Sequence, residues 1–244
     1  MAITLTRERN GCVAHIRYDN AARGNSFDGE LLGKLVDTLE AAALDPMCSV
    51  IRLDMAGRHF CGGWDTTSFG DLSASTTESV AAALRSSDEM LGRIRRLPVP
   101  VVAGVRGQVI GFGAGLLSAV HLPVAAADTR LSLPEVRFGF APAGVGHTIT
   151  QALPRAQAYA LLTGATTASG SQLLAWGLVA RVVPETELET AVHELVETLA
   201  AVPGQALRAV VKVVESSLAT GSADESYLAS ARTIVAGVPA GGVR

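Results

Sequence analysis

Cysteines and long apolar runs are both scarce in this chain, and each scarcity excludes a class of protein. The 244 residues include three cysteines, Cys12, Cys48 and Cys61, whose spacing fits neither a metal site nor a disulfide framework. We therefore expect reduced thiols that pack as small apolar side chains in a cytoplasmic protein. No run of eighteen apolar residues occurs, so no membrane-spanning helix is expected. The first residues also lack the apolar core of a secretory signal.

An excess of charge of one sign is also missing. The net charge is -3 at pH 7, which argues against non-specific binding of nucleic acid. The densest basic cluster is Arg93, Arg95 and Arg96, which could serve an anionic ligand or simply form the solvated face of a helix. The chain does have an ample supply of hydrophobic residues, 48% of the total, enough for the core of one domain of moderate size.

Strand-like and helix-like segments alternate along the first three quarters of the chain. Asn10-Gly11 is a strong hairpin signal between two short strands in residues 3–19. Further strands are predicted at residues 48–57, 99–107, 123–135 and 178–185, with a helical turn from Pro134, and helices at 26–46, 78–98, 116–122, 146–164 and 169–177. The all-apolar segment 99–107 is typical of a strand covered on both faces.

Only helical segments follow residue 183, at 187–203 and 204–221, and residues 233–244 are a Gly- and Pro-rich tail that we expect to be poorly ordered. This order predicts the α/β fold class, with a core over residues 1–183 and a helical C-terminal region over 184–244.

One short stretch is unusually rich in glycine. Residues 107–117 read GQVIGFGAGLL, with glycines placed ahead of an apolar helical run. A dinucleotide-binding loop would fit Gly111 and Gly113, but Leu116 stands at its third glycine position. No acidic residue follows at a strand end at the distance that such a loop requires. We therefore set the nucleotide interpretation aside.

An oxyanion hole is a second use for such glycines. Amide groups at a helix N-terminus are unpaired, and glycine lets a ligand approach them closely. A second donor could come from residues 57–65, GRHFCGGWD, which also follow an apolar strand and expose the backbone around Trp64. From the residues alone, two tight turns without any chemistry are the favoured interpretation.

Four ordered motifs now identify a resemblance. VIRLDMAGRHFCGGWD, LPVPVVAGVRGQVIGFGAGL, LSLPEVRFGFAPAGVG and LLTGATTASGSQLLAWGLVARVVP resemble the crotonase superfamily of enoyl-CoA hydratases and isomerases, in register from residue 3 to 218. The resemblance implies a crotonase-type spiral of ββα units with a helical C-terminal region that mediates trimers. It also implies an acyl-CoA thioester substrate, whose enolate is held by two amides, those of Trp64 and Phe112 by position.

The resemblance also bears on the reaction. Hydratases of this family carry two glutamates, but here the first position is Gly115 and the second is Glu135. One carboxylate suits the removal and return of a proton, so the resemblance favours an enoyl-CoA double-bond isomerase. Hydration by water held with Glu135, which is lyase chemistry, and C–C bond-forming, C–C bond-cleaving or decarboxylating reactions remain alternatives. From the residues alone, Glu135 is better explained as a surface glutamate in a first helical turn, and the catalytic role comes from the resemblance.

The resemblance assigns further residues to substrate and coenzyme A binding. They are Arg23, Gly62, Gly63, Asp65, Gly111, Gly115 and His147. Asp65 also fits a structural role as the cap of the following turn, and His59, His121 and His147 fit structural roles as well. Neither a metal nor a separate cofactor is implied, because coenzyme A enters with the substrate.

Partners follow from the same resemblance. Homotrimers, or pairs of trimers, are expected, with residues 185–200 and 205–218 supplying part of the interface. The C-terminus departs from the family's usual ending, so a carrier-protein thioester remains an alternative to coenzyme A. A non-catalytic RNA-binding relative is disfavoured because no long basic stripe is present. A serine peptidase is disfavoured because Ser118 lies one turn inside the predicted helix.

Overall fold

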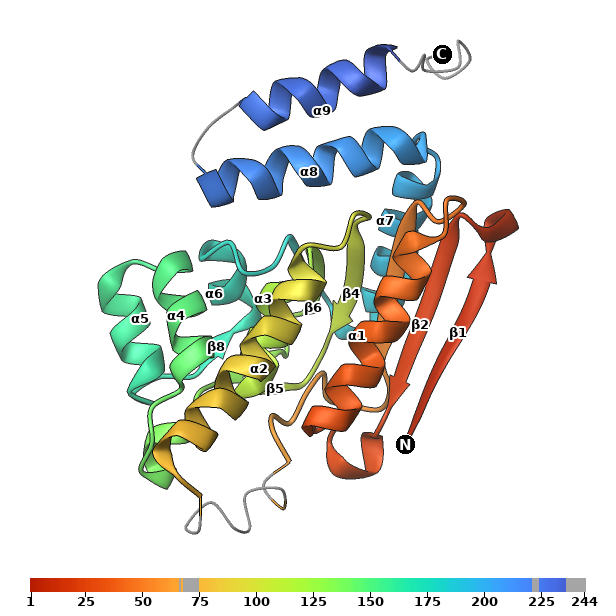
Figure 1. Ribbon diagram of the computed structural model, residues 1–244. Coiled ribbons are helices and arrows are strands. Elements are labelled where there is room, and N and C mark those ends of the chain that lie inside the picture. Colours follow the sequence, from red (N-terminus) through yellow and green to blue (C-terminus); the bar gives the residue numbers. More distant parts are fainter. Residues whose placement is uncertain (66, 68–74, 221–223, 236–244) are drawn as a thin grey trace.

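A computed structural model describes residues 1–65, 67, 75–220 and 224–235 (Figure 1). Its main sheet has the strand order β1-β2-β3-β4-β6-β9, with β1 antiparallel to β2 and the other neighbours parallel. The strands of this sheet are β1 (Ala2–Glu8), β2 (Val13–Asp19), β3 (Val50–Met55), β4 (Val101–Val105), β6 (Leu122–Ala126) and β9 (Arg181–Val183). A second sheet has the order β5-β7-β8, with β5 (Gln108–Ile110), β7 (Arg130–Ser132) and β8 (Ala168–Ser169).

Helices surround these sheets in the alternating order that the sequence indicates. They are α1 (Gly29–Leu44), α2 (Thr77–Arg95), α3 (Phe112–Ala119), α4 (Ala143–Ala152), α5 (Arg155–Leu162), α6 (Gly170–Ala175), α7 (Leu188–Ala200), α8 (Gly204–Thr220) and α9 (Asp224–Val235). Short 3-10 helices span Arg9–Gly11, Ala21–Arg23, Glu135–Phe138 and Glu185–Glu187. The predicted α/β class, the hairpin at Asn10-Gly11 and the turn after Pro134 are confirmed.

The main sheet is covered on both faces, as the apolar segment 99–107 predicts. One face contributes Ile16, Leu53 and their neighbours to the large core shared with α1 and α2. The other face contributes Val50 and Val102 to a smaller core with α7. In Figure 1, α7 accordingly lies behind the sheet, whereas α8 and α9 stack above it. The apolar side of α7 is thus used within the protomer, although the boundary drawn at residue 183 stays a prediction.

Three expectations from the sequence are wrong in detail. The single helix at 146–164 is two helices, α4 and α5, because Pro154 cannot donate the helical hydrogen bond and restricts Leu153 to an extended conformation. Helix α3 begins at Phe112, inside the glycine stretch, and not at 116. Residues 233–235 belong to helix α9, which the sequence analysis missed, and the rest of the predicted tail, 236–244, lies outside the described residues.

All three cysteines are free thiols. Burial raises the pKa of the Cys61 thiol to about 12, so Cys61 packs as an apolar residue and is no nucleophile. In the described part of the chain, no helix is long and apolar enough to cross a membrane. The cytoplasmic location stays a prediction.

Helix α8 is tied to the body of the protein by Arg208. One guanidinium nitrogen, Nη2, lies 2.9, 3.0 and 2.9 Å from the carbonyl oxygens of Ala43, Asp45 and Cys48. Two of these residues flank the C-terminus of α1, where carbonyl groups lack helical partners. The half-buried arginine therefore provides hydrogen-bond partners for carbonyl groups at the end of α1 and also holds α8 in position.

We expect Arg208→Met to lower the free energy of unfolding by about 1–3 kcal/mol, because charge-assisted hydrogen bonds to half-buried carbonyls are lost. Urea denaturation followed by circular dichroism would measure this change. Arg85→Met, at an exposed position on α2, is the matched control and should change stability by less than about 0.5 kcal/mol. Equal stability of the two variants would contradict the anchoring role.

Candidate active site

The two glycine-bearing loops lie side by side, as the sequence analysis predicts. Loop 57–65 follows β3, and Cys61 pairs with Val109 of β5 through a parallel bridge. The Cys61 amide donates to Gln108 at 3.2 Å, and the Ile110 amide donates back to the Cys61 carbonyl at 2.9 Å. A methyl group on Gly113 would lie 2.9 Å from the Cβ and the carbonyl oxygen of Cys61. Glycine is therefore needed there to let the loops touch.

Residues 24–27, which the sequence analysis missed as a functional element, hold loop 57–65 from its other side. The Phe27 amide donates to the Gly63 carbonyl at 3.0 Å, and the Gly62 amide donates to the Gly24 carbonyl at 2.7 Å. Asn25 is fully buried with a left-handed φ of 57°. Its side-chain amide donates to the carbonyls of Ala56 and His59 at 2.7 and 2.8 Å. Asparagine tolerates a left-handed conformation better than most residues, so the asparagine before Ser26 is the one sequence feature that could have indicated this turn.

The amides of Trp64 and Phe112 are the donors proposed for an oxyanion. Phe112 is the first residue of α3, where an amide has no partner within its own helix. Trp64 and Phe27 form a parallel β-bridge. Its hydrogen bonds run from the Phe27 amide to the Gly63 carbonyl and from the Asp65 amide to the Phe27 carbonyl, so the Trp64 amide is not used. Across the described residues, neither the Trp64 nor the Phe112 amide donates a hydrogen bond within the chain. The side-chain rings of Trp64 and Phe112 meet edge to face with centroids 5.2 Å apart. Both residues are half-buried, so they lie together at the same part of the surface.

Glu135 lies against the residue that precedes Phe112. A methyl group on Gly111 would lie 2.6 Å from Oε1 of Glu135, and the Gly111 amide donates to the Ser132 carbonyl at 2.9 Å. Gly111 has a φ of 52° and a ψ of -116°, a conformation that only glycine adopts readily. The Glu135 carboxyl group therefore faces the N-terminal end of α3.

The Glu135 carboxyl group is largely removed from water. Its Oε2 atom is buried and has no hydrogen-bond partner among the described residues. Burial raises the pKa of Glu135, and its own backbone amide only partly opposes that effect. A raised pKa makes the carboxylate a stronger base than an exposed glutamate, which suits a group that takes up and returns a proton.

Gly115, the position of the absent first glutamate, is buried in hydrocarbon. A methyl group there would lie 2.7 Å from Cδ1 of Leu91 on α2 and 3.2 Å from Cγ2 of Val145 on α4. Apart from the backbone of α3 itself and the two chain neighbours, no polar atom of the described residues lies within 4 Å of that point. The sequence already shows that position 115 lacks a carboxylate. The apolar side chains that fill the space around it could not be predicted from the sequence.

Arg23 and Asp65 form an ion pair at the rim of the loops. Arg23 Nη1 lies 2.9 Å from Asp65 Oδ2, and the arginine side chain is 53% exposed. The hydroxyl and amide of Thr67 donate to Asp65, and together with Arg23 they lower the pKa of Asp65. Asp65 therefore caps the following turn and stays ionised, as the structural alternative in the sequence analysis predicts.

Several other candidates lie apart from this site or have structural partners. His59 Nδ1 accepts from the Gln108 amide at 3.1 Å, and His121 links Val101 to Arg95. His147 is exposed on α4, and no contact with Glu135 is seen. The Ser118 hydroxyl donates to the Ala114 carbonyl within α3, so it is not poised as a nucleophile. In the described ranges, no group of His, Cys, Asp and Glu side chains converges as a metal site.

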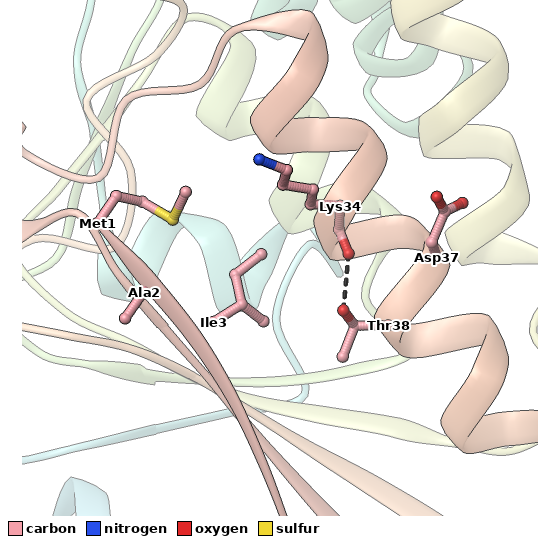
Figure 2. Close-up of a pocket in the computed structure, with 6 residues that line it drawn as sticks. All are labelled: Met1, Ala2, Ile3, Lys34, Asp37 and Thr38. Atoms are coloured by element: carbon pink, nitrogen blue, oxygen red, sulfur yellow. Dashed lines mark hydrogen bonds between the residues drawn. The ribbon is translucent and has the colours of Figure 1, made fainter.

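A surface hollow of about 420 Å³ lies elsewhere, between β1 and α1 (Figure 2). It is lined by Met1, Ala2, Ile3, Lys34, Asp37 and Thr38. Its hydroxyl group, on Thr38, donates to the Lys34 carbonyl of the same helix, and the Lys34 ammonium pairs with Glu30. These groups satisfy one another and include none of the predicted site residues, so the hollow is not a candidate for the reaction.

Comparisons with known proteins agree with this arrangement. The model of the enoyl-CoA hydratase/isomerase family matches residues 8–235. A Bacillus subtilis (strain 168) protein named "Probable enoyl-CoA hydratase" is 31% identical over 159 residues, covering 64% of this chain and 60% of that protein. The 1,2-epoxyphenylacetyl-CoA isomerase of Escherichia coli K12 is 26% identical over 219 residues, covering 89% of this chain and 83% of that enzyme.

The fold agrees as well. The crystal structure of an enoyl-CoA hydratase from Mycobacterium smegmatis superposes with a TM-score of 0.85 at 22% identity, covering 96% of this chain and 90% of that chain. The crotonase-type fold implied by the four motifs is therefore confirmed. Because the family model spans all but the two ends of the sequence, the chain belongs to the enoyl-CoA hydratase/isomerase family of acyl-CoA enzymes.

Proposed function

We propose that the enzyme is an enoyl-CoA double-bond isomerase that converts a 3-enoyl thioester into the 2-enoyl isomer with Glu135 as its single acid and base. The observation that carries this proposal is the asymmetry of the two glutamate positions of the family. Glu135 presents a buried carboxyl group with a raised pKa, whereas Gly115 is enclosed by Leu91 and Val145. One proton carrier without a second suits isomerisation better than addition of water.

The proposed reaction begins with the Glu135 carboxylate removing a proton from Cα of the 3-enoyl thioester. The electron pair of the broken C–H bond moves into the thioester group and gives a dienolate, whose oxygen accepts hydrogen bonds from the amides of Trp64 and Phe112. Glu135 then returns the proton to Cγ, the double bond settles between Cα and Cβ, and the carboxylate is restored. No net proton or electron is consumed.

A hydratase is the second candidate, and the name of the Bacillus subtilis relative favours it. In that reaction a water held by backbone groups would add to Cβ and pass a proton to the Glu135 carboxylate, which would deliver a proton to Cα. The two candidates differ in their products. We expect incubation of the enzyme with a short 3-enoyl-CoA to give the 2-enoyl isomer, and mass spectrometry should find little 3-hydroxyacyl-CoA. A dominant hydroxyacyl product from either enoyl isomer would replace the isomerase proposal with the hydratase.

We also propose that Arg23 contacts the phosphates of coenzyme A, because it is an exposed cation that pairs with Asp65 at the end of loop 57–65. We expect Arg23→Gln to raise KM for an enoyl-CoA about two- to fivefold, the size of one exposed ion pair, with kcat unchanged. Arg17→Gln, an arginine of equal exposure paired with Asp19, is the matched control. An unchanged KM for Arg23→Gln, or the same rise with a pantetheine thioester that lacks the nucleotide, would refute this assignment.

We propose a homotrimer, or a pair of trimers, as the assembly. The apolar side of α7 is used by its own sheet, so residues 185–200 contribute less than the sequence analysis expects. Helix α8 instead leaves Val210, Val214 and Leu218 exposed. Exposed apolar side chains at this spacing support an interface on α8. Multi-angle light scattering should give three or six times the chain mass, and a stable monomer at micromolar concentration would contradict the proposal.

A further inference from the structure

Leu91 and Val145 enclose the position of the absent first glutamate. Both lie at Gly115, which follows Phe112 by three residues along α3. Leu91 is 3% exposed and belongs to the main core, and Val145 packs partly buried against that core. We call this pair the apolar wall. It stands one helical turn beyond the end of α3 that Glu135 faces.

The wall crowds the position of a second acid or base, so Leu91 must shift before any side chain fits there. A side chain at position 115 must start with a Cβ atom 2.7 Å from Leu91 Cδ1, closer than two carbon atoms can approach. The nearest carboxylate on α2, that of Asp88, faces Gly144 and lies 3.6 Å from Arg95. The described side chains at Gly115 therefore offer a water molecule no hydrogen-bond partner, and a space lined by apolar side chains stays dry.

We propose that the apolar wall of Leu91 and Val145 determines the outcome of the reaction, by keeping water and a second carboxyl group out of the space at Gly115, the position of the absent first glutamate. This inference rests on the proposed isomerase function. Addition of water requires the oxygen of a bound water to bond to Cβ, its proton to pass to a base, and Glu135 to deliver a proton to Cα. With the wall in place the base is missing and the dienolate can only recover a proton from Glu135.

If the apolar wall has this role, a glutamate at position 115 should not by itself be sufficient for hydration. Gly115→Glu should lower the melting temperature and show no hydration, because Leu91 blocks the new side chain. Leu91→Ala/Gly115→Glu should hydrate a short 2-enoyl-CoA at least about tenfold faster than Gly115→Glu, a modest part of what a positioned acid or base supplies. Val145→Ala/Gly115→Glu is the second test should the loss of Leu91 prevent folding, since Val145 is only partly buried.

The matched control uses the same helix. Ile94→Ala/Gly115→Glu opens an equally buried position of α2 that is not within 4 Å of the Gly115 methyl position, so it should restore neither hydration nor stability. Leu91→Ala/Gly115→Glu should instead recover part of the melting temperature that Gly115→Glu loses, a non-additivity that only residues in contact show.

The outcomes separate the two claims. If Gly115→Glu alone hydrates as fast as the double variants, or if Leu91→Ala/Gly115→Glu recovers no stability, the apolar wall is refuted while the isomerase proposal stands. If the wild-type enzyme fails to isomerise a 3-enoyl-CoA, the isomerase proposal falls. Hydration by the wild-type enzyme refutes both.

Discussion

Glu135→Gln should reduce isomerisation by roughly 10²–10⁴-fold, the usual contribution of a general acid and base. The substitution keeps the size of the side chain but removes the group that carries the proton. Binding of the thioester should survive, because the amides of Trp64 and Phe112 are untouched. Steady-state kinetics with a 3-enoyl-CoA would show the loss in kcat, with KM changed little.

The same substitution should make the protein more stable at neutral pH. Burial raises the pKa of Glu135 above its ordinary value of 4.5, so between the unfolded and folded pKa values the folded protein binds more protons. The free energy of unfolding therefore falls as the pH rises through that window, and the penalty is complete above the folded pKa. Glu135→Gln removes the penalty, so its melting temperature should exceed that of the wild type at about pH 8 and approach it below about pH 4.

Glu185→Gln is the matched control, because Glu185 also begins a 3-10 helix but is exposed. It should change neither turnover nor stability. Full activity of Glu135→Gln would show that the proton is handled elsewhere and would end the single-glutamate mechanism. Asp65 and His147, which the resemblance assigns to substrate binding, are poorly suited to replace Glu135, because Asp65 is ion-paired and His147 is exposed.

Gly111→Ala should reduce turnover by about 10²–10³-fold, comparable to the loss of one oxyanion donor. Its new methyl group would lie 2.6 Å from Oε1 of Glu135, so the carboxyl group must move. The φ of 52° at Gly111 would also be strained, which would shift the neighbouring Phe112 amide. One substitution therefore disturbs both the proton carrier and the proposed oxyanion site, and kcat should fall with it.

Gly177→Ala separates strain from geometry. Gly177 has a φ of 73°, but a methyl group there would meet nothing within 4 Å, and it lies in the turn between α6 and β9. The Gly177→Ala variant should therefore be somewhat less stable than the wild type and keep its activity. If Gly111→Ala and Gly177→Ala lose turnover equally, the contact between Gly111 and Glu135 has no catalytic importance.

Local patterns along the chain carry most of the fold. The hairpin at Asn10-Gly11, the apolar strand at 99–107 and the turn after Pro134 each depend on residues close in sequence, and each is predicted correctly. Helix α9 was missed because the Gly- and Pro-rich residues that follow it dominate the composition of the tail. The break at Pro154 was missed because the apolar periodicity continues across it.

The candidate site is only partly readable in the same way. The glycines and Glu135 stand in recognisable motifs, so their neighbourhood follows from the resemblance. The apolar wall does not, because Leu91 and Val145 lie 24 residues before and 30 residues after Gly115 and have ordinary core composition. The support from Asn25 depends likewise on contacts with residues 31 and 34 positions away. Such contacts between distant residues are set by the packed fold and leave no local pattern.

The most direct test of a single proton carrier is the fate of the α-hydrogen in one turnover. A 3-enoyl-CoA deuterated at Cα would be isomerised in ordinary water, and the product would be analysed for deuterium at Cγ. Because Glu135 takes the deuteron in a site shielded from water and returns it to the same substrate, part of the label should appear at Cγ. A product that carries only solvent hydrogen at Cγ would contradict the account.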